Sequence, residues 1–258
     1  MTALTEPRAG EPRAGASADE LPRMTLLEHL EELRRRLVAA LAGLTVGFLV
    51  CWAFAPRIFE FLARPIYRHL PPGSKLAYLG VTDPFMLYVK VAALAGAFLT
   101  APFVLYQVWG FVAPGLYRRE RRYAVPFVVA GSLLFLAGGA FAYYVAFPFA
   151  IDFLLRMGAA FQPVITVERY LRFLMTIILG LGLMFELPMV ILLLAQLGLV
   201  TPRGLLRNFR WAVLVIFVVA AIITPTSDIV NLLLFAVPAI LLYLLGIGAA
   251  ALVVRRRR

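Results

Sequence analysis

The stretch YAVPFVVAGSLLFLAGGAFAYYVAFPFAI, residues 123–151, contains no charged side chain. About 20 consecutive apolar residues in a helix are enough to cross the roughly 30 Å hydrocarbon core of a bilayer. The stretch therefore predicts a transmembrane helix, and similar apolar runs lie on both sides of it. We expect five further spans, at residues 37–55, 85–107, 170–200, 211–223 and 229–254.

The composition excludes several classes of protein. The chain has 258 residues, of which 62% are hydrophobic and 15% charged, and its mean hydropathy is +0.89. A soluble domain is typically about 45–50% apolar and about 25% charged. This excess excludes a soluble enzyme and a disordered chain, and it excludes a nucleic-acid-binding domain despite the net charge of +11. Neither Lys75 nor Lys90 lies in a phosphate-binding glycine loop, and no Cys/His cluster predicts a metal site, so we expect no cofactor.

Arginine and lysine predict the orientation in the membrane, because these residues accumulate in cytoplasmic loops. One side of the six spans carries about 17 of them and the other side about 5. Both termini therefore belong on the cytoplasmic side. The expected fold is all-α, a polytopic membrane protein with six transmembrane helices, short fifth and sixth spans and a concave face. The fifth span has about 13 apolar residues and covers roughly 20 Å, so the bilayer beside it must be thin or wet.

Three regions follow along the chain. We expect residues 1–23 to form a disordered cytoplasmic tail and residues 24–252 to form the six-helix transmembrane domain. Residues 253–258 are expected to form a basic cytoplasmic tail. Thr25 and Glu28 form a capping box. The helix that starts there carries a leucine stripe over residues 26–37, which predicts that this part lies along the membrane surface before the first span. The outer loop 56–83 contains a second amphipathic segment.

The sharpest candidate for a functional group is Glu186, close to the middle of the fourth span. An acid at that depth is costly and marks a functional site by default, although a neutral or hydrogen-bonded acid with a purely structural role is the alternative. Pro188, two residues later, removes a helix hydrogen bond and predicts a bend. We expect Glu186 to face a concave, water-accessible surface rather than lipid.

Four further acids have both structural and functional interpretations. Asp228 is either the N-cap of the sixth span or a functional group at the outer turn. Glu120 stands among four arginines and could simply pair with them. Glu31 and Glu32 could pair with Arg35 and Arg36 at i,i+4 spacing.

Four motifs together give the chain a family resemblance. They are HLEELR at 29–34, YQVWGFVAPGLYRRERR at 106–122, FELP at 185–188 and TPTSD at 224–228. With these motifs in this order, residues 24–250 resemble TatC, the polytopic receptor subunit of the twin-arginine translocase.

The resemblance implies a non-enzymatic role in the bacterial or archaeal cytoplasmic (inner) membrane. TatC proteins bind the twin-arginine signal peptides of folded cargo and assemble with single-span TatB-like and TatA-like partners, using the proton-motive force. Membrane lipids and further copies of the chain are the other implied partners. The residues onto which the family's functional positions fall are as follows. Signal-peptide positions are Glu32, Glu120, Phe111, Arg34 and Pro114; intramembrane and outer polar positions are Glu186 and Asp228; structural motif positions are Pro188 and Pro225.

Some features depart from the family or complicate the expected site. Leu232 and Leu244 stand where the family commonly has glutamine and glutamate. Arginines flank both Glu32 and Glu120, and their repulsion should weaken binding of a cationic signal unless they point away. A proton-coupled small-solute transporter using Glu186 and a purely structural membrane scaffold are the alternative functions. The first would predict an inverted repeat, which the sequence does not show, and the second would not need an acid at mid-span.

Overall fold

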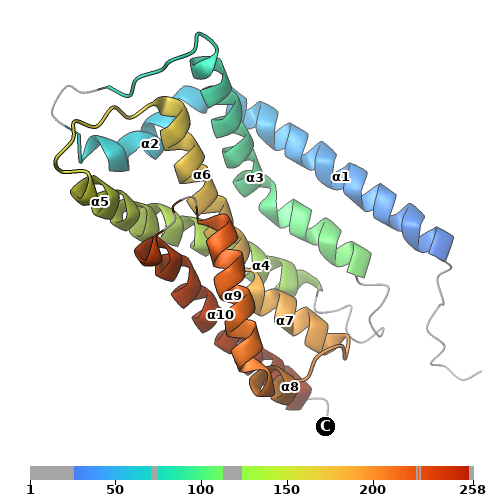
Figure 1. The fold of residues 1–258 in the computed structure, drawn as a ribbon. Coiled ribbons are helices and arrows are strands. Elements are labelled where there is room, and N and C mark those ends of the chain that lie inside the picture. The colour runs from blue at the N-terminus through green and yellow to red at the C-terminus, as the bar shows by residue number, and fades with distance from the viewer. Residues whose placement is uncertain (1–25, 71–74, 113–123, 225, 227, 256–258) are drawn as a thin grey trace, which may run out of the picture.

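The computed structural model describes residues 26–70, 75–112, 124–224, 226 and 228–255, and these residues are helical almost throughout (Figure 1). Pairing between extended segments is limited, within these ranges, to one isolated bridge that joins Ala77 to Thr166. The expectation of an all-α fold is confirmed. The predicted tail at residues 1–23 and the predicted cap at Thr25 lie outside the described residues.

The described helices follow one another in the following order. They are α1 (Leu26–Trp52), α2 (Ala55–Tyr67), α3 (Asp83–Val112), α4 (Ala124–Phe141), the π-helical turn η3 (Ala142–Ala146), α5 (Phe147–Met157), α6 (Val167–Met184), α7 (Leu187–Gln196), α8 (Pro202–Arg207), α9 (Phe209–Ile223) and α10 (Ile229–Arg255). The run α4–η3–α5 is one continuous helical rod, and α6 and α7 are two halves of another.

Five of these rods are long and apolar enough to cross a membrane: Leu27–Trp52, Asp83–Phe111, Val125–Met157, Val167–Gln196 and Ile229–Leu252. The remaining span, α9, has 15 residues and is shorter, as expected. The expectation of a short sixth span is wrong, because α10 is a 27-residue helix that continues through Pro238.

The first helix also differs from expectation. The amphipathic segment 26–37 and the first span form one uninterrupted 27-residue helix. The helical hydrogen bonds simply continue, because no proline or glycine separates the leucine stripe from the span. The inner end of α1 therefore projects along the axis of the span instead of turning to lie on the membrane surface.

Helix α1 packs mainly against α3, and the two lie side by side at one edge of the molecule (Figure 1). Glycines allow their backbones to touch. A Cβ placed on Gly96 would lie 2.7 Å from the Phe48 nitrogen and 2.9 Å from the Gly47 carbonyl carbon. Small residues at helix contacts are the usual basis of close packing in membranes. Only 11% of the first span is buried, so its other faces are left for lipid or partners.

The outer helix α2 is fastened to the bundle by two tyrosines. Pro65 lies inside α2 and has no N–H, so the carbonyl of Phe61, four residues earlier, lacks its helical donor. The Tyr143 hydroxyl donates to that carbonyl at 2.5 Å, and the Tyr170 hydroxyl donates to the neighbouring Leu62 carbonyl at 2.6 Å. The proline thus creates an acceptor that the third span satisfies, which ties α2 to η3 and α6.

The fourth span is interrupted at Glu186, as the sequence predicts. Helix α6 ends at Met184 and α7 begins at Leu187. The Glu186 N–H donates to the Leu183 carbonyl at 3.1 Å, a tighter turn than in an α-helix. Pro188 cannot donate to the carbonyl of Met184. The break therefore places an acidic side chain between two half-helices.

The orientation can be checked by cysteine labelling. Cys51 is buried and is replaced by alanine first. We predict that Lys75→Cys reacts with a membrane-impermeant maleimide from outside the cell, whereas Arg207→Cys reacts only after permeabilisation, because arginines accumulate on the inner side. Labelling of Lys75→Cys from the cytoplasmic side alone would contradict this topology.

The glycine contact between α1 and α3 makes a second prediction. Gly96→Ala should lower the free energy of unfolding in detergent micelles by about 1–3 kcal/mol, because the methyl group meets backbone atoms that cannot move independently. Gly248→Ala is the matched control, since a Cβ there has no atom within 4 Å. Both replacements gain the same helix propensity, so equal stability of the two variants would show that the close contact carries no energy.

Candidate functional site

The carboxylate of Glu32, near the inner end of α1, is held by two arginines of the same helix. Arg36 donates from Nε to Oε1 at 2.7 Å, and Arg35 donates from Nη2 to Oε2. The Glu32 side chain is only 10% exposed. These two flanking arginines therefore point toward the acid, because Coulomb attraction pairs them with it. The Glu32–Arg36 pair has the i,i+4 spacing that the sequence analysis allowed, whereas Arg35 pairs with Glu32 at i,i+3.

Arg36 also joins α1 to α3. Its Nη1 donates to Oε1 of Gln107 at 3.1 Å, across 71 positions of sequence. Its guanidinium lies against Gly110, where a Cβ would be 2.5 Å from Cζ. Sequence reasoning assigned no role to Gln107 or Gly110, although a lone glutamine and a glycine near the inner end of an apolar span are a signal that could have been used.

An aromatic pair lies one turn from Glu32. The rings of His29 and Phe111 stack with centroids 4.6 Å apart, which brings the expected position Phe111 to the same end of the α1–α3 pair. Three leucines at the same end of α1, Leu30, Leu33 and Leu37, are exposed on a neighbouring face of the helix. The site thus combines a carboxylate, an aromatic stack and an open apolar stripe.

Of the remaining expected signal-peptide positions, the structure describes Arg34, and it does not join this cluster. Arg34 is exposed, and it points away from Glu32 because residues i and i+2 of a helix do not share a face. Glu120 and Pro114 lie outside the described residues, as does Pro225 of the outer turn.

Glu186 lies against the third span. A Cβ on Gly131 of α4 would be 3.2 Å from its Oε2, so the glycine makes room for the carboxylate. The Oε1 atom is buried and has no hydrogen-bond partner among the described residues. An unsatisfied polar oxygen at this depth is costly. That Glu186 faces a concave, hydrated surface stays a prediction.

A second polar atom without a partner lies in the same seam of α3, α4 and α7. The Trp109 ring packs on Phe127 with centroids 4.4 Å apart, and Met189 completes the cluster. Trp109 is 2% exposed, and its Nε1 finds no acceptor among the described residues. Sequence reasoning did not single out this indole, since an interfacial tryptophan is an ordinary feature of membrane proteins.

Asp228 performs the capping role that was one of its two interpretations. Its Oδ1 accepts from the Asn231 N–H at 2.7 Å, and its Oδ2 accepts from the Asn231 side-chain amide at 2.9 Å. The same amide donates to Thr226 Oγ1 at 3.0 Å. Partial burial raises the pKa of Asp228, but the hydrogen bonds from Asn231 and Thr226 outweigh it, and the net pKa lies below its usual value. A further functional role stays a prediction.

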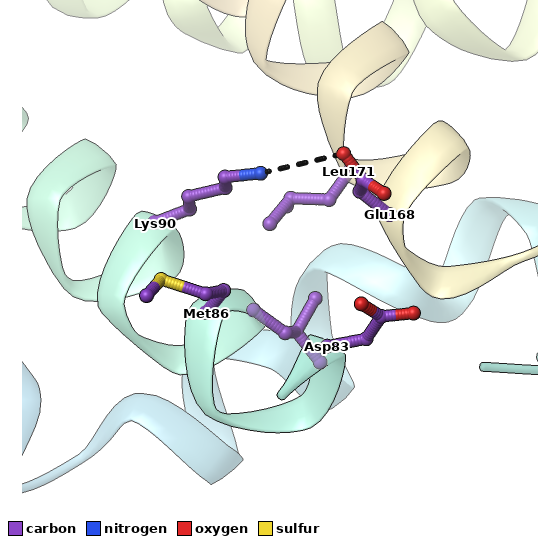
Figure 2. Close-up of a pocket in the computed structure, with 6 residues that line it drawn as sticks. Asp83, Met86, Lys90, Glu168 and Leu171 are labelled. Atoms are coloured by element: carbon purple, nitrogen blue, oxygen red, sulfur yellow. Dashed lines mark ion pairs between the residues drawn. The ribbon is translucent and has the colours of Figure 1, made fainter. Parts of the chain in front are cut away.

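At the outer end, a small hollow opens between α3 and α6 (Figure 2). Lys90 Nζ lies 3.9 Å from Oε1 of Glu168, which also accepts from Arg172 at 2.7 Å, and Asp83 lies at the rim. The hollow has a volume of about 130 Å³, which is below the roughly 300–1,000 Å³ of small-molecule sites. The hollow therefore gives no support to a small-solute transporter.

Comparisons with known proteins agree with one another. The family model described as "Sec-independent protein translocase protein (TatC)" matches residues 28–238. A protein of that name from Koribacter versatilis (strain Ellin345) is 50% identical over 249 residues, covering 95% of this chain and 92% of the relative. Its namesake from Aquifex aeolicus (strain VF5) is 34% identical over 238 residues, covering 91% of this chain and 98% of the relative.

Two solved structures have the same fold. The structure titled "Crystal Structure of Twin Arginine Translocase Receptor- TatC" superposes with a TM-score of 0.76 at 34% identity, covering 87% of this chain and 99% of that chain. The second, of the same receptor in DDM, gives a TM-score of 0.78 at 34% identity, with 86% and 99% covered. The chain therefore belongs to the TatC family of Sec-independent protein translocase proteins, which are multi-pass membrane components of a translocase and not enzymes.

Proposed function

We propose that this chain binds the twin-arginine signal peptides of folded proteins at the cytoplasmic face of the membrane. The observation that supports this most directly is the position of Glu32. Its carboxylate lies one helical turn from the His29–Phe111 stack, and an exposed leucine stripe runs along a neighbouring face of the same helix. The solved relatives are titled as a twin arginine translocase receptor, and the same role for this chain is consistent with that title.

The chemistry of the site matches the two parts of such a signal. A carboxylate oxygen accepts charge-assisted hydrogen bonds from a guanidinium, and these are stronger than hydrogen bonds between neutral groups. A leucine stripe takes up the apolar stretch that follows the arginines, because burial of apolar area is favourable. Glu120 would supply a second carboxylate for the second arginine, with Phe111, Arg34 and Pro114 as neighbouring motif positions.

Translocation itself requires partners and an energy source. We infer assembly with TatB-like and TatA-like single-span proteins and with further copies of this chain, driven by the proton-motive force. The thinly covered α1 and the 15-residue α9 leave apolar surface within the membrane for such helices and for lipid. A span as short as α9 covers about 22 Å and locally thins the bilayer, which lowers the barrier to passage of a folded protein.

Glu186 is proposed to act during translocation. Glu186 lies between two half-helices, where the backbone is already irregular. Its side chain can therefore change position more easily than that of an ionisable residue in a continuous helix. Its unpartnered oxygen can take a donor from water or from an incoming segment.

The binding role of Glu32 makes a direct prediction. Glu32→Gln should weaken binding of a twin-arginine signal peptide to the chain in lipid nanodiscs by about 10- to 150-fold, since a lost charge-assisted pair costs about 1.5–3 kcal/mol. Glu31→Gln, at the exposed neighbouring position, removes the same charge and should bind normally. Equal affinity of the two variants for the peptide would refute the role of Glu32.

The role of Glu186 is tested by transport of a folded reporter. Glu186→Gln should insert normally and export less than wild type, because it keeps the shape and loses only ionisation. Glu186→Leu should insert at least as well and export least. The matched control is Glu168→Gln, an acid at the outer end of the same rod. Full export by the leucine variant is incompatible with this role.

A further inference from the structure

The two arginines that hold Glu32 differ sharply in how firmly they are held themselves. The Arg36 side chain is 25% exposed, whereas that of Arg35 is 72% exposed. Each contacts a different oxygen of the carboxylate: Arg36 contacts Oε1 and Arg35 contacts Oε2. The two oxygens of one acid are thus occupied by one anchored and one loosely held guanidinium.

Arg36 is anchored by a second helix. Its Nη1 donates to Gln107, a side chain that is only 7% exposed, and its flat face covers Gly110. If Arg36 left this position, the Gln107 oxygen would lose its partner in a buried place, which is more costly than loss of an exposed bond. Arg36 therefore stays in place and fixes the orientation of Glu32 relative to α3.

Arg35 makes a contact that is easily exchanged. The Arg35 side chain is 72% exposed, so water and salt compete for its charge and its pair with Glu32 contributes little to stability. A guanidinium arriving from outside offers Oε2 the same charge-assisted hydrogen bond that Arg35 provides. Replacement of one by the other leaves the carboxylate paired throughout and exposes no buried group.

We propose that Arg35 occupies the signal-binding oxygen of Glu32 as an internal substitute for a signal arginine, and that Arg36 is a positioning residue that holds the acid for the exchange. This proposal rests on the proposed receptor function. Arg35 lowers the affinity for every cationic ligand of Glu32, so that the acid is never bare and weakly basic segments do not accumulate on it. A signal with two arginines and an apolar stretch gains enough from its other contacts to displace Arg35.

The test compares two variants that remove the same charge one residue apart. Arg35→Gln should bind a fluorescent twin-arginine signal peptide about two- to fivefold more tightly than wild type, measured by anisotropy on the full-length chain in nanodiscs. Arg36→Gln should bind it at least about tenfold more weakly. A general electrostatic effect would move both affinities in the same direction, so changes of the same sign would overturn the proposal. Arg207→Gln, on the exposed surface of α8, is the control for loss of a distant charge.

Two further measurements separate these roles from damage to the fold. Gly110→Ala pushes the Arg36 guanidinium aside without altering charge and should weaken binding as Arg36→Gln does. The affinity of Arg35→Gln for the peptide should fall more steeply with salt than that of wild type. In wild type, salt weakens the competing Arg35–Glu32 pair as well as the pair with the peptide, so part of the loss is offset, whereas the variant has no competing pair. An unchanged salt dependence, or normal binding by Gly110→Ala, would contradict the proposal.

The Glu32→Gln variant in the same assay distinguishes the receptor function of Glu32 from the exchange of Arg35 on Oε2. If that variant binds the peptide as wild type does, the receptor function at Glu32 fails. If it loses binding while Arg35→Gln shows no gain, only the exchange on Oε2 fails.

Discussion

The backbones of α1 and α3 touch at Gly47 and Gly96, and this contact sets how the rest of the inner end is built. With the helices this close, the Arg36 guanidinium spans from Glu32 to Gln107, and His29 reaches Phe111. Since α1 packs mainly on α3, the placement of its carboxylate depends on this one helix pair. The close packing of glycines within the membrane thereby determines the geometry of the charged site at the inner end of the two helices.

A second constraint acts throughout the bundle, because a backbone group buried in protein or in lipid needs a hydrogen-bond partner. At Pro65 the freed carbonyl is taken by a tyrosine of the third span. At Pro188 the fourth span divides into two half-helices, and Glu186 lies at the division. One proline thus strengthens the outer end of the bundle, while the other leaves an irregular site with an unpartnered carboxylate oxygen.

Much of the fold follows from sequence because hydrophobic length is a strong signal in membrane proteins. The apolar runs, the short α9 and the interruption at Glu186 were all predictable from spacing and proline chemistry. The single continuous α1 was not, since an amphipathic stripe fits a surface helix and an extended span equally well. The pairing of Arg36 with Glu32 could be predicted from its i,i+4 spacing. The Arg36–Gln107 bond could not, because it joins residues 71 positions apart that only tertiary packing brings together.

The most direct test of the receptor assignment is photo-crosslinking from the ligand. A photoreactive residue is placed immediately after the two arginines of a twin-arginine precursor, and the adducts on this chain in native membranes are mapped by mass spectrometry. Binding at Glu32 predicts adducts in residues 26–37 of α1 and at the inner end of α3, lost when the two arginines are replaced by lysines. Adducts confined to the outer segment around α2, or adducts that persist with the lysine precursor, would contradict it.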